Sequence, residues 1–402
     1  MLSQEVRERY ADVLLWGLFT ARNQPFERGD VILVRFDLPA LPVAEVLQER
    51  ILALGFNPVL RLMPTPTLER QFFCLADEDQ AGFQPPGERE LCEGLNGSIY
   101  LNAPESLTHL KEAPPEKLSA FSLSRKPLRD ILDRREQDGS FGWTLGIVPT
   151  RELARQARTS LSAYTRQWAA ACYLDREDPV ARWKEVYERV RDLKAWLNAL
   201  PVKSLRVESS RTDLTVTVGK DRRWAGVSGH NIPSFEVFLS PDFRGTEGVY
   251  FADQPSYRFG NYVEGATLVF EKGVVRKATA QEGEQFLKEQ IAMDKGASRV
   301  GEFSLTDRRF SRICRFMAST LFDENYGGRF GNCHLALGSS YADTYAGDPR
   351  TLTPKARQNL GFNDSALHWD LVNTERKCVT ALFSTGGSKV IYENGEFSDQ
   401  AG

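Results

Sequence analysis

Two of the four histidines in this 402-residue chain lie in settings that suit a metal ion. His334 follows a glycine-rich loop and begins a short apolar run, and His368 lies two residues before Asp370. In an extended segment residues i and i+2 point the same way, so the last two present an imidazole and a carboxylate side by side. Glu302 adds another carboxylate upstream. The stretch from Gly301 to Asp370 therefore predicts a metal site.

A fifth candidate ligand, Glu236, lies inside an apolar, strand-like run. A carboxylate is costly there unless it is paired or bound to metal, and the other four candidates favour a metal over a simple ion pair. Five nitrogen and oxygen ligands are more than one catalytic zinc with an open position needs. They suit two nearby divalent ions that share a carboxylate. Such ligands admit zinc, cobalt or manganese.

Composition restricts where such a site could work. The 51 basic and 54 acidic residues give a formal charge of −3, which favours neither nucleic acid nor an anionic membrane as a partner. No apolar run reaches the length of a membrane span, and the first residues lack the pattern of a signal peptide. Six scattered cysteines without a C-x-x-C pair indicate reduced thiols. We expect a cytoplasmic protein.

The first half of the chain alternates strand-like and helix-like patterns. Apolar runs typical of buried strands occur at 31–36, 58–63, 97–101 and 143–148. Helical patterns cover 3–22 and 43–54 and are expected near Pro104 and Thr150. This alternation predicts βαβ units on a mainly parallel sheet. No nucleotide-binding fingerprint follows a strand, so we expect this half to be a scaffold, to cover the substrate or to form a dimer.

A long helical pattern at 179–200 separates two parts of the chain that differ in their secondary-structure patterns. Beyond it come short strands, two hairpins with glycine turns near 268–275 and 390–397, and helices expected near 281–294 and 306–321. The predicted fold class is α/β. It comprises an N-terminal α/β domain over residues 1–200 with a mainly parallel sheet, and a C-terminal mixed α+β domain over residues 201–402 that carries the metal site.

Several motifs resemble one known family in combination and in order. They are Asn231-Ile232-Pro233-x-x-Glu236-Val237-Phe238, Gly301-Glu302, Asp323-Glu324-Asn325, His334-Leu335-Ala336-Leu337-Gly338 with Tyr341, and Asn363-x-Ser365-x-x-His368-x-Asp370. The sequence is similar to the thermophilic metalloaminopeptidases of the aminopeptidase T and aminopeptidase S type. The likeness extends over essentially the whole chain and is more diffuse in the first half.

The resemblance implies a ligand set and a reaction. It implies that Glu236, Glu302, His334, His368 and Asp370 bind a pair of divalent metal ions, and that Tyr341 takes part in catalysis. It further implies a cytosolic homodimer that removes N-terminal residues from peptides. The loop at 326–332 departs from the family by lengthening the step between Glu302 and His334, so we expect an altered pocket wall and substrate preference.

The expected mechanism uses a water activated by two metals. Glu302 would lie closest to that water, as a bridging ligand or as a base, and Tyr341 would donate a hydrogen bond to the oxyanion. The α-amine of the substrate would bind a metal or an acidic side chain. Two alternative functions use the same residues: another metallohydrolase, such as a carboxypeptidase or amidohydrolase, and a non-catalytic metal-binding module.

Other residues near these motifs have simpler interpretations. The run Asp323-Glu324-Asn325 could touch the site or end a helix in solvent, and we leave it outside the predicted ligand set. His109 and His230 are interpreted as surface or loop histidines. Cys333 lacks the setting of a cysteine protease and is expected to be a small buried hydrophobe.

Overall fold

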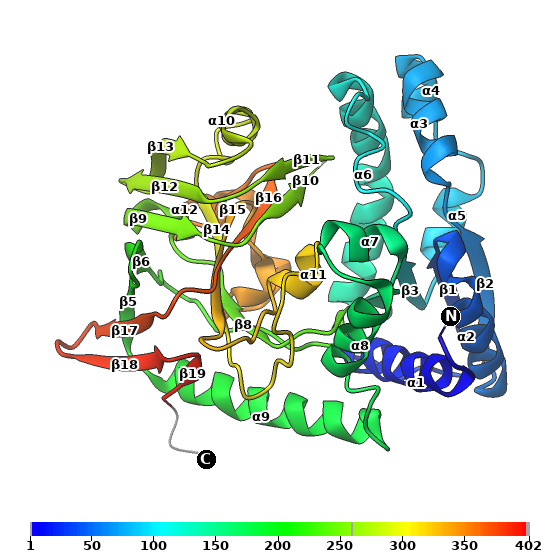
Figure 1. Cartoon of the computed structure of the whole chain (residues 1–402), viewed down its shortest axis with the longest axis horizontal. Helices are drawn as coiled ribbons and strands as arrows, with labels where there is room; N and C mark the ends of the chain where they lie inside the picture. The colour runs from blue at the N-terminus through cyan, green and yellow to red at the C-terminus, as the bar shows by residue number, and fades with distance from the viewer. Residues whose placement is uncertain (1, 259, 399–402) are drawn as a thin grey trace. The chain divides into compact units, whose positions relative to one another are not determined.

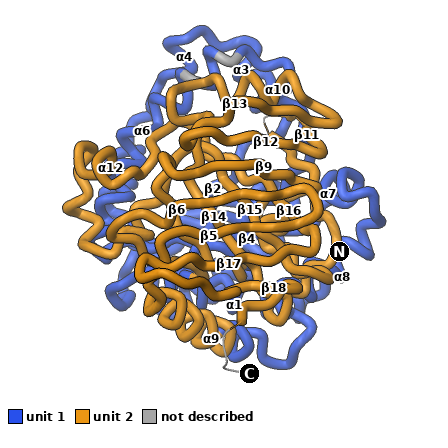
Figure 2. The backbone as a smooth tube through the Cα atoms, turned by 90° about the vertical axis from the view of Figure 1, so that its left-hand side faces the viewer, with its two compact units in different colours: residues 1–183, 228–233 blue, residues 184–227, 234–402 orange. Residues whose placement is uncertain are grey.

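The computed structural model describes residues 2–258 and 260–398, and by backbone contacts it divides into two units. One unit contains residues 1–183 and 228–233, and the other contains 184–227 and 234–402 (Figure 2). The sequence placed a boundary near residue 200, whereas the division falls inside the long helix α9 (Pro179–Ala199). The indole of Trp183 donates to the Cys172 carbonyl in the first unit, and Lys194 donates to the Gly226 carbonyl in the second. Side chains at the two ends of one helix therefore serve different units.

The first unit contains a five-stranded parallel sheet, as the alternating pattern predicted, in the order β2-β1-β3-β4-β7. Its strands are β1 (Val31–Phe36), β2 (Asn57–Leu62), β3 (Gly97–Asn102), β4 (Gly142–Ile147) and β7 (Asn231–Ile232). The last strand is supplied by the segment that returns from the second half of the chain. The backbone N–H of Leu145 donates to the carbonyl of His230 at 2.6 Å and helps to hold that strand.

Helices connect the strands of the first unit (Figure 1). They are α1 (Gln4–Ala21), α2 (Leu41–Ala53), α3 (Pro66–Leu75), α4 (Glu78–Gly82), α5 (Glu88–Gly94), α6 (Pro115–Gln137), α7 (Arg151–Gln156) and α8 (Leu161–Ala171). Helix α1 buries one apolar stripe, which includes Tyr10, Leu14 and Leu18. The helix expected near Pro104 is absent from the described residues, and α6 begins only at Pro115.

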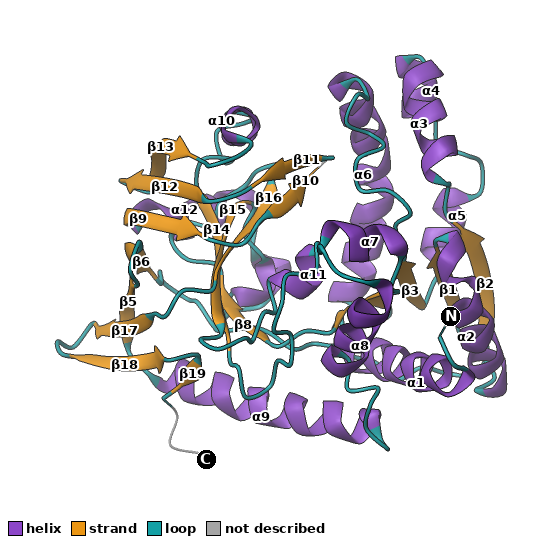
Figure 3. Ribbon diagram, viewed as in Figure 1, coloured by secondary structure: helices purple, strands orange, loops and turns teal. Residues whose placement is uncertain are grey.

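The second unit is mostly antiparallel (Figure 3). Its eight-stranded sheet has the order β13-β12-β9-β6-β5-β17-β18-β19, and its four-stranded sheet has the order β16-β15-β14-β8. Strands of the larger sheet are β5 (Val202–Glu208), β6 (Asp213–Thr217), β9 (Glu247–Ala252), β12 (Ala266–Glu271), β13 (Val274–Thr279), β17 (Cys378–Phe383), β18 (Ser388–Glu393) and β19 (Glu396–Phe397). Both expected hairpins are confirmed as β12–β13 and β18–β19.

The four-stranded sheet consists of β8 (Glu236–Leu239), β14 (Val300–Thr306), β15 (Asn332–Gly338) and β16 (His368–Asn373). A separate hairpin joins β10 (Ser256–Arg258) to β11 (Asn261–Val263). The helices of this unit, besides α9, are α10 (Glu284–Ile291), α11 (Thr320–Asp323) and α12 (Pro354–Leu360). The helix expected at 306–321 is wrong, because that segment is turn and irregular chain up to α11. Asp307 binds the backbone N–H groups of Arg309 and Phe397 there.

One face of the four-stranded sheet is apolar. It includes Val237, Leu239, Phe303, Leu305, Leu335, Leu337 and Leu371, all of which are almost fully buried. The hydroxyl of Tyr250, on β9 of the larger sheet, donates to the carbonyls of Cys333 and Leu371 at 3.1 and 2.7 Å. Burial of that face fixes which residues occupy the opposite one, since neighbouring side chains along a strand alternate between faces.

Candidate metal centre

All five predicted ligands lie on one face of the four-stranded sheet, opposite its apolar face. Strand register explains why. Glu302 is aligned with Ala336, which is aligned with Asp370, and His368 is aligned with Gly338. His334 lies two residues before Ala336 and so shares its face, as residues i and i+2 of a strand do. Glu236 is aligned with Thr306, which has the same parity on β14 as Glu302. Polar side chains from four strands therefore converge on one region of this sheet face.

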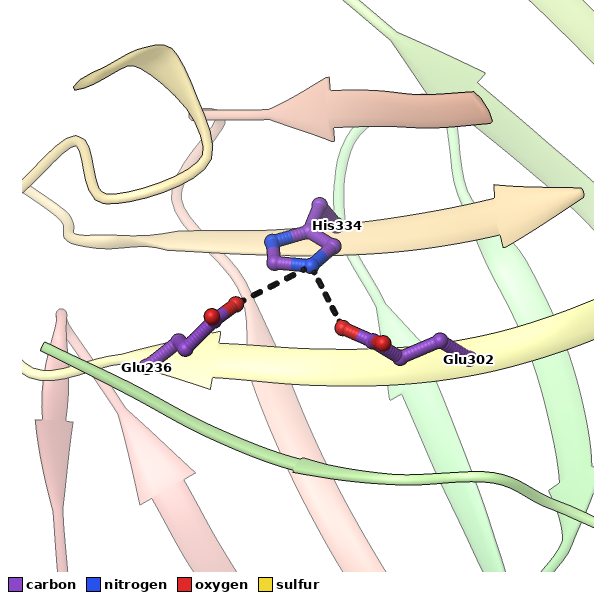
Figure 4. Close-up of side chains that lie close together, drawn as sticks. All are labelled: Glu236, Glu302 and His334. Atoms are coloured by element: carbon purple, nitrogen blue, oxygen red, sulfur yellow. Dashed lines mark hydrogen bonds and ion pairs between the residues drawn. The ribbon is translucent and has the colours of Figure 1, made fainter. Parts of the chain in front are cut away.

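The five side chains form a close cluster. Nε2 of His334 lies 3.0 Å from Oε1 of Glu302, 3.5 Å from Oε2 of Glu236 and 3.8 Å from Oδ1 of Asp370. Nε2 of His368 lies 3.4 Å from Oδ1 of Asp370 and 4.0 Å from Oε2 of Glu302. Figure 4 shows Glu236 and Glu302 converging on the His334 ring. The structure therefore brings together every residue that the sequence predicted as a ligand.

Both histidines are oriented by backbone carbonyls. Nδ1 of His334 lies 3.3 Å from the Glu324 carbonyl, and Nδ1 of His368 lies 3.0 Å from the Ser339 carbonyl. A carbonyl can only accept, so in each ring Nδ1 carries the proton and Nε2 points into the cluster. This arrangement is typical of metal-binding histidines, whose other nitrogen donates to a carbonyl or carboxylate. The donor set therefore fits a divalent ion.

Burial and the charges of neighbouring side chains strongly shift the pKa values of several residues in the cluster. Burial would lower the pKa of His334, but the hydrogen bond to Glu302 and the surrounding carboxylates outweigh it and raise that pKa to about 9. Burial is outweighed in the same way at His368, whose pKa is also raised to about 9, mainly by Asp370. Burial and the charge of Glu302 raise the pKa of Glu236 to about 8. Perturbation of this kind is concentrated at functional sites.

Tyr341 lies at the rim of the cluster. Its ring centroid is 4.7 Å from that of His368, and the residue is 46% exposed. Burial of the titrating oxygen and the charges of Glu302 and Asp370 raise the pKa of Tyr341 well above its usual value. The hydroxyl therefore stays a neutral O–H donor, and it makes no hydrogen bond with any described residue. Its backbone N–H donates to the hydroxyl of Ser240 at 2.8 Å, which fixes the start of this loop.

Comparison with known proteins decides the family. The thermophilic metalloprotease (M29) family matches residues 3–397. The chain belongs to the M29 family. The chain is 25% identical to aminopeptidase PepS of Streptococcus thermophilus, over 98% of each protein. It is 33% identical to aminopeptidase T of Thermus aquaticus over 61% of this chain and 60% of that protein.

A solved structure shares the fold of this M29 chain. It is wild-type AmpT from Thermus thermophilus, with a TM-score of 0.81 and 22% identity, covering 97% of this chain and 99% of that one. The match confirms the predicted fold class, with a mainly parallel sheet in the N-terminal part and a mixed α+β C-terminal part, whose sheets are antiparallel. No helix among the described residues is long and apolar enough to span a membrane.

The ligand set predicted from the sequence left out Glu324, a buried acid whose backbone carbonyl contacts His334. Glu324 is 8% exposed, and none of the described residues donates a hydrogen bond to its carboxylate. Burial and the charges of Glu236, Asp370 and Glu302 raise its pKa well above the usual value. Its backbone carbonyl is the acceptor for His334. Glu324 is therefore a buried acid beside the ligands and not a solvated helix end.

The residues on either side of Glu324 have structural roles. Oδ1 and Oδ2 of Asp323 accept from the backbone N–H groups of Met317 and Ser319 at 2.7 and 2.9 Å. Oδ1 of Asn325 accepts from the N–H of Phe235 at 2.5 Å, directly before Glu236. The run Asp-Glu-Asn thus holds a loop through Asp323, buries the acid Glu324 and fixes the start of β8 through Asn325. Three consecutive polar residues in a buried segment were the signal that could have identified Glu324.

The loop at 326–332 is tied to its surroundings. The N–H of Gly327 donates to the Ile313 carbonyl at 2.8 Å, and the side-chain amide of Asn332 donates to the carbonyls of Glu324 and Tyr326 at 3.0 and 2.7 Å. Gly331 has φ of 56°, a conformation that favours glycine. The loop therefore joins the Glu324 segment directly to the strand that carries His334.

Proposed function

We propose that this M29 metallo-aminopeptidase binds two divalent cations in the cluster and uses them to release N-terminal amino acids from peptides. The observation that carries the proposal is the convergence of two Nε2 atoms and several carboxylates on one sheet face, with both histidines oriented by carbonyls. Family membership and the aminopeptidase names of the relatives support the reaction class. Zinc, cobalt and manganese all suit imidazole and carboxylate ligands.

The cluster divides naturally into two halves about Glu302. Oε1 of Glu302 faces His334, whereas Oε2 faces His368. Glu236 lies on the His334 side and Asp370 lies closer to His368 than to His334. Glu236 and His334 would therefore hold one cation, His368 and Asp370 would hold the other, and Glu302 would be available to both as a shared ligand. A shared carboxylate is the usual means of holding two cations close together.

Glu324 extends the proposed ligand set. Its carboxylate is buried, is subject to the charges of Glu236, Asp370 and Glu302, and has no hydrogen-bonding partner among the described residues, so its burial is costly unless a cation is bound beside it. The main-chain carbonyl of the same residue orients His334. We assign Glu324 to the His334 side of the cluster.

Two bound cations would supply a water-derived nucleophile at neutral pH and would polarise the scissile carbonyl. The chain's own residues complete the chemistry. Glu302, at the centre of the cluster, would lie closest to the attacking water, either as the shared ligand or as the base that accepts its proton. The Tyr341 hydroxyl stays protonated and is free to donate a hydrogen bond to the developing oxyanion. Loss of one such donor typically lowers the rate by about 100-fold or more.

The decisive experiment is hydrolysis of leucine p-nitroanilide by protein stripped with a chelator, before and after zinc, cobalt or manganese is restored. Activity should vanish and return with metal, and N-acetyl-leucine p-nitroanilide should not be cleaved. His368→Ala should abolish the restored activity, whereas His109→Gln, in the first unit, should keep it. No activity with any metal would refute the aminopeptidase assignment. Cleavage of acetylated or C-terminal substrates would identify a different metallohydrolase, and metal binding without turnover would identify a binding module.

We also propose a cytoplasmic homodimer that acts on peptides. All six cysteines are free thiols, which suits a reducing compartment. We propose that the first unit acts as scaffold, as cover for the substrate or as dimer interface, and that the second carries the catalytic site. Light scattering at several protein concentrations tests the dimer, and fractionation of the source cells tests the compartment.

A further inference from the structure

The parallel sheet of the first unit has a reversal in its strand order. The chain runs from β1 to β2 on one side and then crosses to β3 on the other side, followed by β4. In open parallel sheets of this kind, ligands bind outside the carboxyl ends of the strands, at the point where the order reverses. A second site is therefore expected among the residues that directly follow β1, β2 and β3.

A cavity of about 440 Å³ lies at this edge. One wall comes from α3, which follows β2, and includes Pro66, Arg70, Cys74 and Leu75. The other wall comes from the segment after β3 and includes Ser106 and His109. Pockets for small molecules typically have volumes of about 300–1,000 Å³. The cavity is thus large enough for a small organic ligand.

The two walls are fastened to each other. Nε2 of His109 lies 2.7 Å from Oε2 of Glu69 on α3, and Nδ1 of the same ring lies 3.2 Å from the Ser106 carbonyl. Lys117 Nζ, on α6, donates to the Cys74 carbonyl at 3.2 Å. Glu69 is therefore occupied by His109. The shape of the cavity is set by bonds within the protein and needs no ligand to form it.

Arg70 is an exposed, positively charged residue of the lining. It makes no hydrogen bond or ion pair with any described residue, and it lies on α3 one residue after Glu69. A guanidinium presents a fork of N–H donors that matches a carboxylate or a phosphate. Leu75 and Pro66 add apolar surface beside it, and Leu75 is 80% exposed. The lining thus combines one free cation with an apolar wall.

We propose that this cavity is a second binding site, separate from the metal cluster, for a small organic anion. The ligand would be a monocarboxylate with a short branched apolar chain, with its carboxylate on Arg70 and its chain against Leu75 and Pro66. A nucleotide is disfavoured because no glycine-rich turn follows β1, where Asp37 binds the N–H of Ala103. The proposal does not depend on the metal site or on peptide hydrolysis.

Cys74 provides a direct probe, because its exposed thiol lies in the lining. In a Cys314→Ser background, which removes the other exposed cysteine, we would measure the rate at which DTNB modifies Cys74 with and without 4-methylpentanoate. The carboxylate should slow modification about tenfold at saturation, and the neutral 4-methylpentanamide should not, because it lacks the charge that pairs with Arg70. Saturation-transfer NMR on the methyl groups of the ligand should report contact with the wall.

Matched variants decide the outcome. Arg70→Gln should weaken protection about tenfold or more, and the exposed Arg89→Gln on α5 should not change it, because only the former removes the proposed anchor. Cys74→Ala should keep the NMR signal, which shows that the thiol is only a reporter. Equal protection by the amide, protection by inorganic phosphate as strong as by the carboxylate, or no binding of any of the three would overturn the proposal.

Discussion

The neighbouring acids Asp323 and Glu324 are predicted to respond in opposite ways when each is replaced by its amide. Glu324→Gln removes a buried carboxylate that has neighbouring acids and no hydrogen-bond donor. In Asp323→Asn one of the two carboxylate oxygens is replaced by an amide nitrogen, which cannot accept a hydrogen bond. The backbone N–H of either Met317 or Ser319 therefore loses its acceptor. The first change should weaken metal binding and leave the fold intact. The second should destabilise the fold and leave metal binding nearly unchanged.

The structure sets the size of both effects. A unit charge about 4 Å from another interacts by roughly 4 kcal/mol at an effective dielectric constant near 20, and desolvation cancels much of this. A net loss of only about 1.4 kcal/mol at Glu324 is already a tenfold loss of affinity. We therefore expect metal binding to weaken at least about tenfold. An unsatisfied backbone N–H at Asp323→Asn should cost about 1–3 kcal/mol of unfolding free energy.

Two assays separate these outcomes. Competition with a chromogenic chelator gives metal affinity, and thermal unfolding of chelator-stripped protein gives stability without metal. Glu324→Gln should have an unchanged or higher Tm in the stripped protein, since it removes an acid whose burial is unfavourable. Asp323→Asn should lower Tm by a few degrees. If Glu324→Gln binds metal with the affinity of the natural sequence, Glu324 is not a ligand and the argument from its unpartnered carboxylate is wrong.

Three further predictions follow from the same contacts. Tyr341→Phe should lower kcat about 100-fold and leave metal content unchanged, and an unchanged kcat would exclude Tyr341 as the oxyanion donor. Chelation should lower the Tm of the natural sequence, and this is checked by restoring metal; saturation at about 100 times Kd is worth about 2.7 kcal/mol. Asp294 accepts hydrogen bonds from the N–H groups of Gly296, Ala297 and Ala366 and from the Ser365 hydroxyl, and although burial opposes it, these bonds lower the pKa of Asp294. Its stabilisation is present above the unfolded-state pKa and is lost as pH falls through the folded-state pKa. The stability difference between the natural sequence and Asp294→Asn, about 2 kcal/mol near neutral pH, should therefore shrink in acid, as urea unfolding at several pH values would show.

The spacing of apolar residues along the chain was sufficient to predict regular helices and strands that bury one face. It predicted β1 and α2, and it predicted the β12–β13 hairpin from its glycine turn. It failed at 306–321, because apolar residues there are buried by an irregular chain whose backbone is held by Asp307 and Asp323. Apolar spacing cannot distinguish a helix from a loop that buries the same side chains.

Antiparallel register explains which parts of the candidate site the sequence could reveal. The spacing of His368 and Asp370 identifies two residues on one face, since strand geometry is local. Glu302 and Glu236 join that face only through pairing of β14 with its neighbours, which sequence spacing does not contain. Glu324 reaches the cluster from a turn after α11, outside any strand, so no alternation pattern could mark it.

The buried acids of the cluster link the stability of the fold to metal binding. Three acids of one sheet face, Glu236, Glu302 and Asp370, and Glu324 from the turn after α11 are buried with only two imidazoles. Without metal, protons must supply the missing positive charge, which is why the carboxylates raise the pKa values of both histidines and of Glu236. Divalent cations can replace those protons and relieve the same repulsion, so metal binding and stability are linked. The apolar face of the sheet supplies the free energy that holds these acids together until metal binds.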